Sequence, residues 1–134
     1  MNGMTTVEER VTITLNGQTY PDLEVNFAPY AEREGGVAIQ LWDTVGEEGW
    51  GPEPIATATV NLQAYNESPA DGCVFIKDYS ENSGMLASLI ATGKVRETGR
   101  FVQASWSMVP EVELLDDWLE AAQIAESSRD GFIA

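Results

Sequence analysis

VTITLNG, at residues 11–17, decides the fold of this chain. Its first five residues alternate apolar side chains with threonines, which is the pattern of a strand with one buried face. Asn16-Gly17 follows at once and favours a two-residue hairpin turn, because both central positions of that turn need positive φ. Apolar and polar residues alternate again over residues 23–27. The sequence therefore predicts an antiparallel β-hairpin close to the N-terminus.

Further short strands are predicted beyond this hairpin. They are β-branched, aromatic or alternating runs bounded by turn residues, and they cover Val37–Trp42, Ile55–Leu62, Cys73–Ile76 and Phe101–Val109. Residues 43–54 are rich in glycine and proline, so they indicate a loop between two of these strands.

Two helices are predicted in the second half of the chain. The apolar face of the first consists of Met85, Leu86, Leu89 and Ile90. Ser80–Asn82 supply residue types that favour a helix N-terminus, and Thr92-Gly93 supplies a glycine stop. The second helix is predicted to open at Pro110. Its apolar face consists of Leu115, Trp118, Leu119 and Ala122, and its acidic face of Glu113, Asp116, Asp117 and Glu120.

These patterns predict an α+β fold with an antiparallel sheet of five to six strands, one packed helix and an acidic C-terminal helix. A chain of 134 residues has the length of one domain. Within it, we expect residues 1–109 to form the α+β core and residues 110–134 to form the acidic helix.

The charge of the chain is its most unusual property. It has 22 acidic residues, 7 basic residues and no histidine, for a net charge of −15. Such a field repels nucleic acids and anionic membranes and attracts cationic surfaces. We therefore expect no direct contact with nucleic acid or membrane, and a protein with a basic surface as the partner. A purely solubilising role for the excess acid is the alternative.

Other features narrow the class of protein. No apolar stretch approaches the roughly 20 residues of a membrane span, and the N-terminus lacks the pattern of a secretory signal. A cytoplasmic location is expected. The lack of histidine removes the usual general base and zinc ligand. One cysteine, Cys73, heads an apolar run and fits a small core residue better than a nucleophile. We predict no enzymatic activity, no metal and no cofactor.

Two acidic segments are the candidate partner-binding sites. The loop at residues 43–53 holds Glu47, Glu48, Trp50 and Glu53. An exposed Trp50 would suit an interface anchor, although it could instead fold back over the edge of the sheet. The second segment is the acidic face of the C-terminal helix. Residues four apart on a helix rise by about 6 Å, which resembles the spacing of phosphates along a DNA strand in order of magnitude. An ordinary solvated face is the alternative.

A small basic cluster follows the first helix and consists of Lys94, Arg96 and Arg100. We expect it to neutralise nearby acids rather than to bind phosphate.

Four stretches resemble a family of small acidic domains from bacteria and their phages. They are residues 37–41, 53–62, 74–86 and 98–100, of which Lys77–Met85 is the most specific. The likeness covers about residues 11–109. This family has no established activity, so the resemblance implies no functional residue. The loop at residues 43–52 and the segment from Pro110 look like additions to the family pattern.

A setting in mobile elements implies, by analogy, an inhibitor of host defence. We therefore expect an acidic protein that occupies the cationic DNA groove of a CRISPR effector or restriction enzyme. The alternative is a protein–protein adaptor or structural module, in which the apolar face of the C-terminal helix docks on a partner or on a second copy. Both a monomer and a homodimer fit the sequence.

Overall fold

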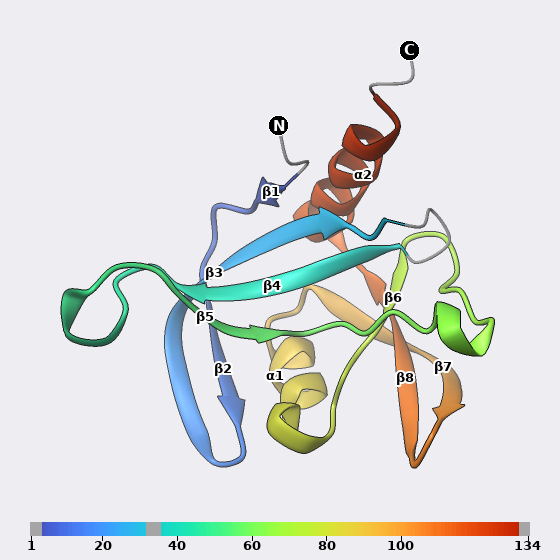
Figure 1. Cartoon of the computed structure of the whole chain (residues 1–134), viewed down its shortest axis with the longest axis horizontal. Coiled ribbons are helices and arrows are strands. Elements are labelled where there is room, and N and C mark those ends of the chain that lie inside the picture. The colour runs from blue at the N-terminus through green and yellow to red at the C-terminus, as the bar shows by residue number, and fades with distance from the viewer. Residues whose placement is uncertain (1–3, 32–35, 132–134) are drawn as a thin grey trace.

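The structure, a computed structural model, describes residues 4–31 and 36–131, without the side chains of Glu47 and residues 129–131. Its strands form two antiparallel sheets, drawn in Figure 1. The first sheet contains β1 (Thr5–Thr6), β2 (Val11–Leu15), β3 (Gln18–Pro29), β4 (Val37–Asp43) and β5 (Glu53–Thr57). The second contains β6 (Cys73–Phe75), β7 (Val95–Ala104) and β8 (Ser107–Leu114).

Two α-helices accompany the sheets. They are α1 (Met85–Ala91) and α2 (Asp116–Gly131), with short 3₁₀ turns at η2 (Glu47–Gly49), η3 (Gln63–Tyr65) and η4 (Ser80–Asn82). The α+β class is confirmed, with the strands divided between two sheets. No helix within residues 4–31 and 36–131 is long and apolar enough to cross a membrane.

The predicted N-terminal hairpin is confirmed. β2 and β3 pair antiparallel, and Leu15 faces Gln18 across the turn. Asn16 and Gly17 have φ values of 52° and 82°, as a two-residue turn of this type requires. β3 is long enough to pair also with β1 and β4, so it lies at the centre of the first sheet.

The predicted strand at Phe101–Val109 is wrong, because the chain reverses direction inside it. Ser105 and Trp106 form a two-residue turn between β7 and β8, and Ser105 takes a positive φ of 57°. Ala104 and Ser107 pair across this turn. The result is a long β7–β8 hairpin where a single strand was expected.

One backbone connection links the two sheets. The chain after β5 runs beside β6, where Thr59 and Ile76 form an isolated bridge. The N–H of Val60 donates to the carbonyl of Phe75, and the N–H of Lys77 donates to that of Ala58. The segment after β5 thus continues as a neighbour of the second sheet.

Helix α1 is where the sequence predicts it, but its start is later. Ser80–Asn82 form η4, and Gly84 is the residue before the helix, with φ of 104°. Asp78 Oδ1 accepts hydrogen bonds from the N–H groups of Gly84 and Leu86. A side chain at position 84 would place its Cβ 2.6 Å from the carbonyl oxygen of Thr14. Glycine therefore allows the start of α1 to approach β2.

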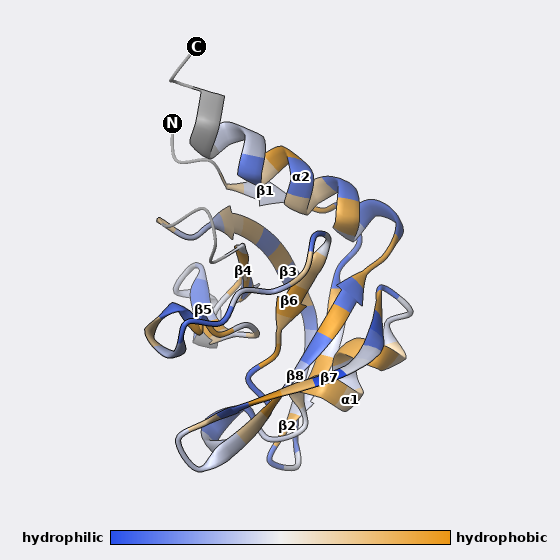
Figure 2. Cartoon of the chain, turned by 90° about the vertical axis from the view of Figure 1, so that its right-hand side faces the viewer, coloured by the Kyte–Doolittle hydropathy of each residue, from blue (hydrophilic) through white to orange (hydrophobic). Residues whose placement is uncertain are grey.

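The second helix begins at Asp116, not at the predicted Pro110. Pro110 lies in β8 opposite Phe101, in an extended segment whose Val112 and Leu114 side chains are buried in the core. Burial of these two side chains favours the strand up to Leu114. Figure 2 shows α2 beyond that point, lying across the end of the first sheet near β1.

Trp118 anchors α2 to the first sheet. Its side chain is 0% exposed and meets Phe27 of β3 edge-on, with ring centroids 5.6 Å apart. Ala122 and Ala125 are buried beside it in the same core. The predicted apolar face of the C-terminal helix therefore packs inside the protein.

Candidate functional site

The β4–β5 loop is a compact structure. Asp43 Oδ1 accepts hydrogen bonds from the N–H groups of Val45 and Gly46, both at 3.1 Å. The N–H of Gly51 donates to the carbonyl of Val45 at 2.9 Å and closes the loop. A Cβ at position 46 would lie 1.8 Å from the carbonyl oxygen of Gly51. These contacts fix the backbone that carries the first candidate site.

Trp50 lies in this loop, directly after η2. Its side chain is 84% exposed, so it does not fold back over the sheet edge. Glu48 and Glu53 are exposed on either side of it in sequence, while the side chain of Glu47 lies outside those described. Figure 1 shows the loop projecting at the far left of the molecule. The structure thus presents a tryptophan and flanking carboxylates on an ordered support.

The predicted acidic helix face is wrong at Glu113. This residue lies in β8, where its Oε1 atom is 2.6 Å from Nη2 of Arg96. The chain is still extended here because the strand continues to the buried Leu114. Glu113 therefore lies on a different element from the other three predicted acids, and a neighbouring strand neutralises it.

Asp116 and Asp117 occupy the first turn of α2, and Glu120 follows one turn later. Carboxylates in a first turn are stabilised by the positive end of the helix dipole. The position of these two aspartates is therefore explained by helix stability, without any partner. Asp117 also accepts a hydrogen bond from Nζ of Lys94 at 2.7 Å, and this bond raises the pKa of Lys94. Asp116 and Glu120 are exposed.

Glu8 joins these acids in space. A groove of about 270 Å³ between β1 and α2 is lined by Glu8, Asp117, Glu120 and Ile124, among others. No local pattern connects Glu8 with residues more than a hundred positions away, so the sequence alone does not reveal this neighbour. The acids near α2 thus come from two distant parts of the chain.

The two acidic segments do not form one continuous face. In Figure 1 the β4–β5 loop projects at the left, whereas α2 rises at the top. The eight predicted site residues therefore divide into a loop group, a helix group and the separate Glu113.

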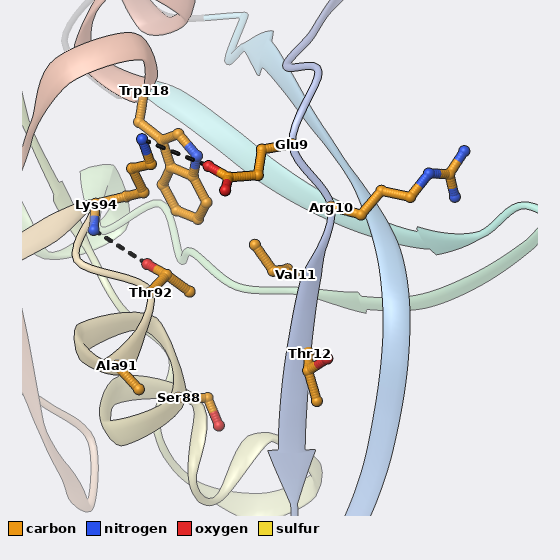
Figure 3. A pocket seen from close by; sticks show the side chains of 9 residues that line it. All are labelled: Glu9, Arg10, Val11, Thr12, Ser88, Ala91, Thr92, Lys94 and Trp118. Atoms are coloured by element: carbon orange, nitrogen blue, oxygen red, sulfur yellow. Dashed lines mark hydrogen bonds and ion pairs between the residues drawn. The ribbon is translucent and has the colours of Figure 1, made fainter.

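A cavity of about 340 Å³ lies between the start of β2 and the end of α1 (Figure 3). Trp118 lines its inner wall, and Lys94 and Glu9 lie at its rim with 3.7 Å between Nζ and Oε1. Lys94 also pairs with Asp117, and Ser88 bonds to the backbone of Thr14. Lys94 and Glu9 thus neutralise each other. Arg10 points away from the cavity (Figure 3) and donates to the carbonyl of Asp22 and the hydroxyl of Thr44, so we place the binding site elsewhere.

The basic cluster neutralises acids, as predicted. Besides the pairs of Lys94 and Arg96 given above, Arg100 bridges Glu67 and Glu111 at 2.8 and 2.9 Å. Glu111 is the more deeply placed of the two, with 3% exposure. Burial would raise its pKa, but hydrogen bonds from Ala70, Thr98 and Arg100 lower it on balance. Arg100 and Glu111 thus fasten the loop before β6 to the second sheet.

The side chain of Cys73 is half-buried at the start of β6. Burial, and then the charges of Glu111 and Glu113, raise the pKa of its thiol to about 11. It is therefore a protonated thiol at neutral pH, which is a poor nucleophile. Residues 4–31 and 36–131 contain no group of three or more potential ligand side chains that could hold a metal ion.

The turn of the β7–β8 hairpin carries an exposed apolar surface that was not predicted from the sequence. Trp106 is 98% exposed, Met108 56% and Phe101 49%. A turn signal was hidden here because Ser105-Trp106 lacks the glycine or asparagine that marks most two-residue turns. The absence of any charged residue from 101 to 110 is the signal that could have singled out this segment.

Comparisons with family models, curated proteins and solved structures give no match to this chain. The resemblance to a family of small acidic domains stays a prediction. The fold and the site define an acidic α+β domain with an ordered tryptophan-bearing loop.

Proposed function

We propose that this protein binds another protein through the β4–β5 loop, with Trp50 as the anchor. The observation that carries the proposal is the 84% exposure of Trp50 on a loop held by its own hydrogen bonds. Tryptophan is enriched among residues that dominate binding energy, and an ordered loop loses little conformational freedom on binding.

The charge of the chain supports a cationic partner surface. Glu48 and Glu53 are exposed beside Trp50, and neither makes an ion pair within the described part of the chain. A net charge of −15 speeds the approach of a basic protein and slows the approach of an acidic one. The acids near α2, including Asp116 and Glu120, add to this field from the top of the molecule.

Within this class, we propose a nucleic-acid-handling protein as the partner, such as a CRISPR effector or a restriction enzyme. Such proteins have cationic grooves for DNA, and the loop would occupy one and exclude the nucleic acid. The regular spacing of helix acids gives no support to this idea, because Glu113 is not on α2. The support comes from net charge and from the exposed loop.

The alternative, an adaptor that docks through the apolar face of α2, has less support. Trp118 and Ala122 of that face are buried in the core, while Leu115 and Leu119 are partly exposed.

The test is DNA binding and cleavage by a panel of purified CRISPR effectors and restriction enzymes, with and without this protein. We expect inhibition of at least one enzyme, and we expect it to weaken as salt rises from about 50 to 300 mM. Trp50→Ser, and separately the double variant Glu48→Lys, Glu53→Lys, should abolish it. The matched control is Asp71→Lys, Glu126→Lys, which changes net charge equally at another face. Equal loss of inhibition in this control would show that net charge, and not the β4–β5 loop, determines binding. Full inhibition by both loop variants would exclude the loop as the binding site.

A further inference from the structure

The β7–β8 hairpin differs from the rest of the surface in two ways. Its residues 101–110 carry no charge in a chain with a net charge of −15. Its turn also exposes Trp106, Met108 and Phe101, which are large apolar side chains. Figure 1 shows this hairpin at the lower right of the molecule, away from the β4–β5 loop at the left. Exposed apolar groups gathered in this way mark interaction surfaces.

β7 is also a free edge of the second sheet. The strand order is β6-β8-β7, so β7 pairs with β8 on one side only. Ala104 and Ser107 flank a two-residue turn and so form a hydrogen-bonded pair; antiparallel pairs then alternate in type along the hairpin. Phe101 and Gln103 belong to the pairs without mutual hydrogen bonds. Their N–H and C=O groups therefore point outward from β7.

The pairing of Pro110 is consistent with this geometry. Pro110 faces Phe101 and has no N–H to offer β7, while its carbonyl accepts a hydrogen bond from Ile76 on the side of β6. The opposite side of the hairpin, at Phe101 and Gln103, has no backbone partner within the described residues.

The charged part of β7 is separated from this edge. An irregular stretch between Glu97 and Phe101 interrupts the register with β8, and the charged residues of the strand lie at or before it. Natural edge strands are protected by charges, prolines or irregularities. In β7 these devices protect the first half of the strand and leave residues 101–104 open.

We propose that this edge is the interface of a symmetric dimer, formed with a second copy of the chain. Two β7 strands would pair antiparallel about a two-fold axis beside Val102, so that Phe101 of each copy faces Gln103 of the other. The outward backbone groups of both residues would then be satisfied in both copies at once.

Charge decides in favour of a second copy over a basic protein. The uncharged hairpin offers a cationic partner no carboxylate, whereas the β4–β5 loop and α2 do. Two copies repel each other wherever their acidic surfaces face, and residues 101–110 are a surface on which they can meet without opposing like charges. The exposed Trp106 and Met108 would cover the partner strand on its open face.

The salt dependence separates this dimer from the proposed function. Salt screens the repulsion between two molecules of charge −15, so the dimer should tighten as salt increases. Binding of a cationic partner through the β4–β5 loop should weaken under the same change. Failure of one proposal therefore leaves the other open to its own test.

The experiment is sedimentation equilibrium of the full chain at about 50 and 500 mM NaCl, with protein up to about 200 μM. We expect a monomer–dimer equilibrium with a smaller Kd at the higher salt. Phe101→Lys, which places like charges close together near the two-fold axis, should raise the Kd by at least about tenfold, as should Trp106→Ser. Trp50→Ser is the matched control and should leave the Kd unchanged.

A protein that is monomeric at both salts and at the highest concentration overturns the proposal. So does a dimer whose Kd is the same in wild type and Phe101→Lys. Far-ultraviolet circular dichroism of each variant verifies the fold. Hydrogen exchange gives a second measurement, since the N–H groups of Phe101 and Gln103 should become protected only as the dimer population rises with protein concentration. Exchange at these two positions that is independent of protein concentration would also contradict the interface.

Discussion

Nη1 of Arg100 lies 2.9 Å from Oε2 of Glu111, a carboxylate that is 3% exposed. The same carboxylate accepts hydrogen bonds from the N–H of Ala70 at 2.9 Å and from the hydroxyl of Thr98 at 2.8 Å. A single buried charge thus connects the loop before β6 with both long strands of the second sheet. We therefore expect its removal to lower the free energy of unfolding.

Glu111→Gln should destabilise the protein by about 1–3 kcal/mol at neutral pH, because Arg100 would lose a buried charged partner. The folded pKa of Glu111 is lowered from 4.5, so its contribution is complete above that value and is lost as the pH falls toward the folded pKa. Urea unfolding of wild type and variant should therefore differ most at neutral pH and less at acidic pH, as Glu111 becomes protonated. Glu113→Gln, in a more exposed ion pair, is the control and should cost less. A gap that stays constant between neutral and acidic pH would contradict this role.

Gly84→Ala should destabilise the protein by about 1–3 kcal/mol. The new Cβ would lie 2.6 Å from the carbonyl oxygen of Thr14, at a φ of 104° that alanine disfavours. Gly93→Ala is the matched control, because its φ is also positive but nothing lies within 4 Å of the added Cβ. Thermal unfolding should rank the two variants in this order. Equal melting temperatures would show that the contact between α1 and β2 relaxes freely.

Gly46→Ala should disturb the β4–β5 loop with little effect on global stability. Its Cβ would collide with the carbonyl of Gly51, and none of the loop side chains that the structure describes belongs to the buried core. The indole N–H resonance of Trp50 should shift while the melting temperature stays near that of wild type. Gly49→Ala, with positive φ but open space around its Cβ, should shift this resonance less. A large fall in melting temperature for Gly46→Ala would mean that the loop supports the sheet.

Trp118→Ala should cost about 3–5 kcal/mol, because it removes a fully buried ring that packs on Phe27. Trp118→Phe should cost only about 1 kcal/mol. It keeps an aromatic ring, and no described residue accepts a hydrogen bond from the indole N–H that it removes. Chemical denaturation of both variants measures the difference. A phenylalanine variant as unstable as the alanine variant would indicate that the N–H is bonded in solution.

Local sequence patterns predicted those parts of the fold that depend on local geometry. Asn16-Gly17 marked its turn because positive φ is needed there, and the period of the apolar residues located α1. Tertiary packing overrode local preference at Pro110, where the buried Val112 and Leu114 extend β8 and postpone the second helix. The turn at Ser105-Trp106 lacked a local marker altogether.

Of the candidate site, too, only the locally determined part could be predicted from the sequence. The composition of residues 43–53 indicated a loop, and hence an accessible Trp50. The partners of the acids were not predictable, because Arg100 meets Glu67 across 33 positions and Lys94 meets Asp117 across 23. Such long-range ion pairs decide which carboxylates stay free, and one sequence without its fold does not show them.

The opposite placement of the β4–β5 loop and the β7–β8 hairpin has a steric consequence (Figure 1). A partner bound at the β4–β5 loop leaves the β7–β8 hairpin uncovered, so both surfaces can be occupied at the same time. Two copies joined at their hairpins would hold their Trp50 loops outward, at the far extremities of an elongated particle. The two loops of such a dimer could then bind two suitably separated grooves of one target at once, with the avidity of a bivalent ligand.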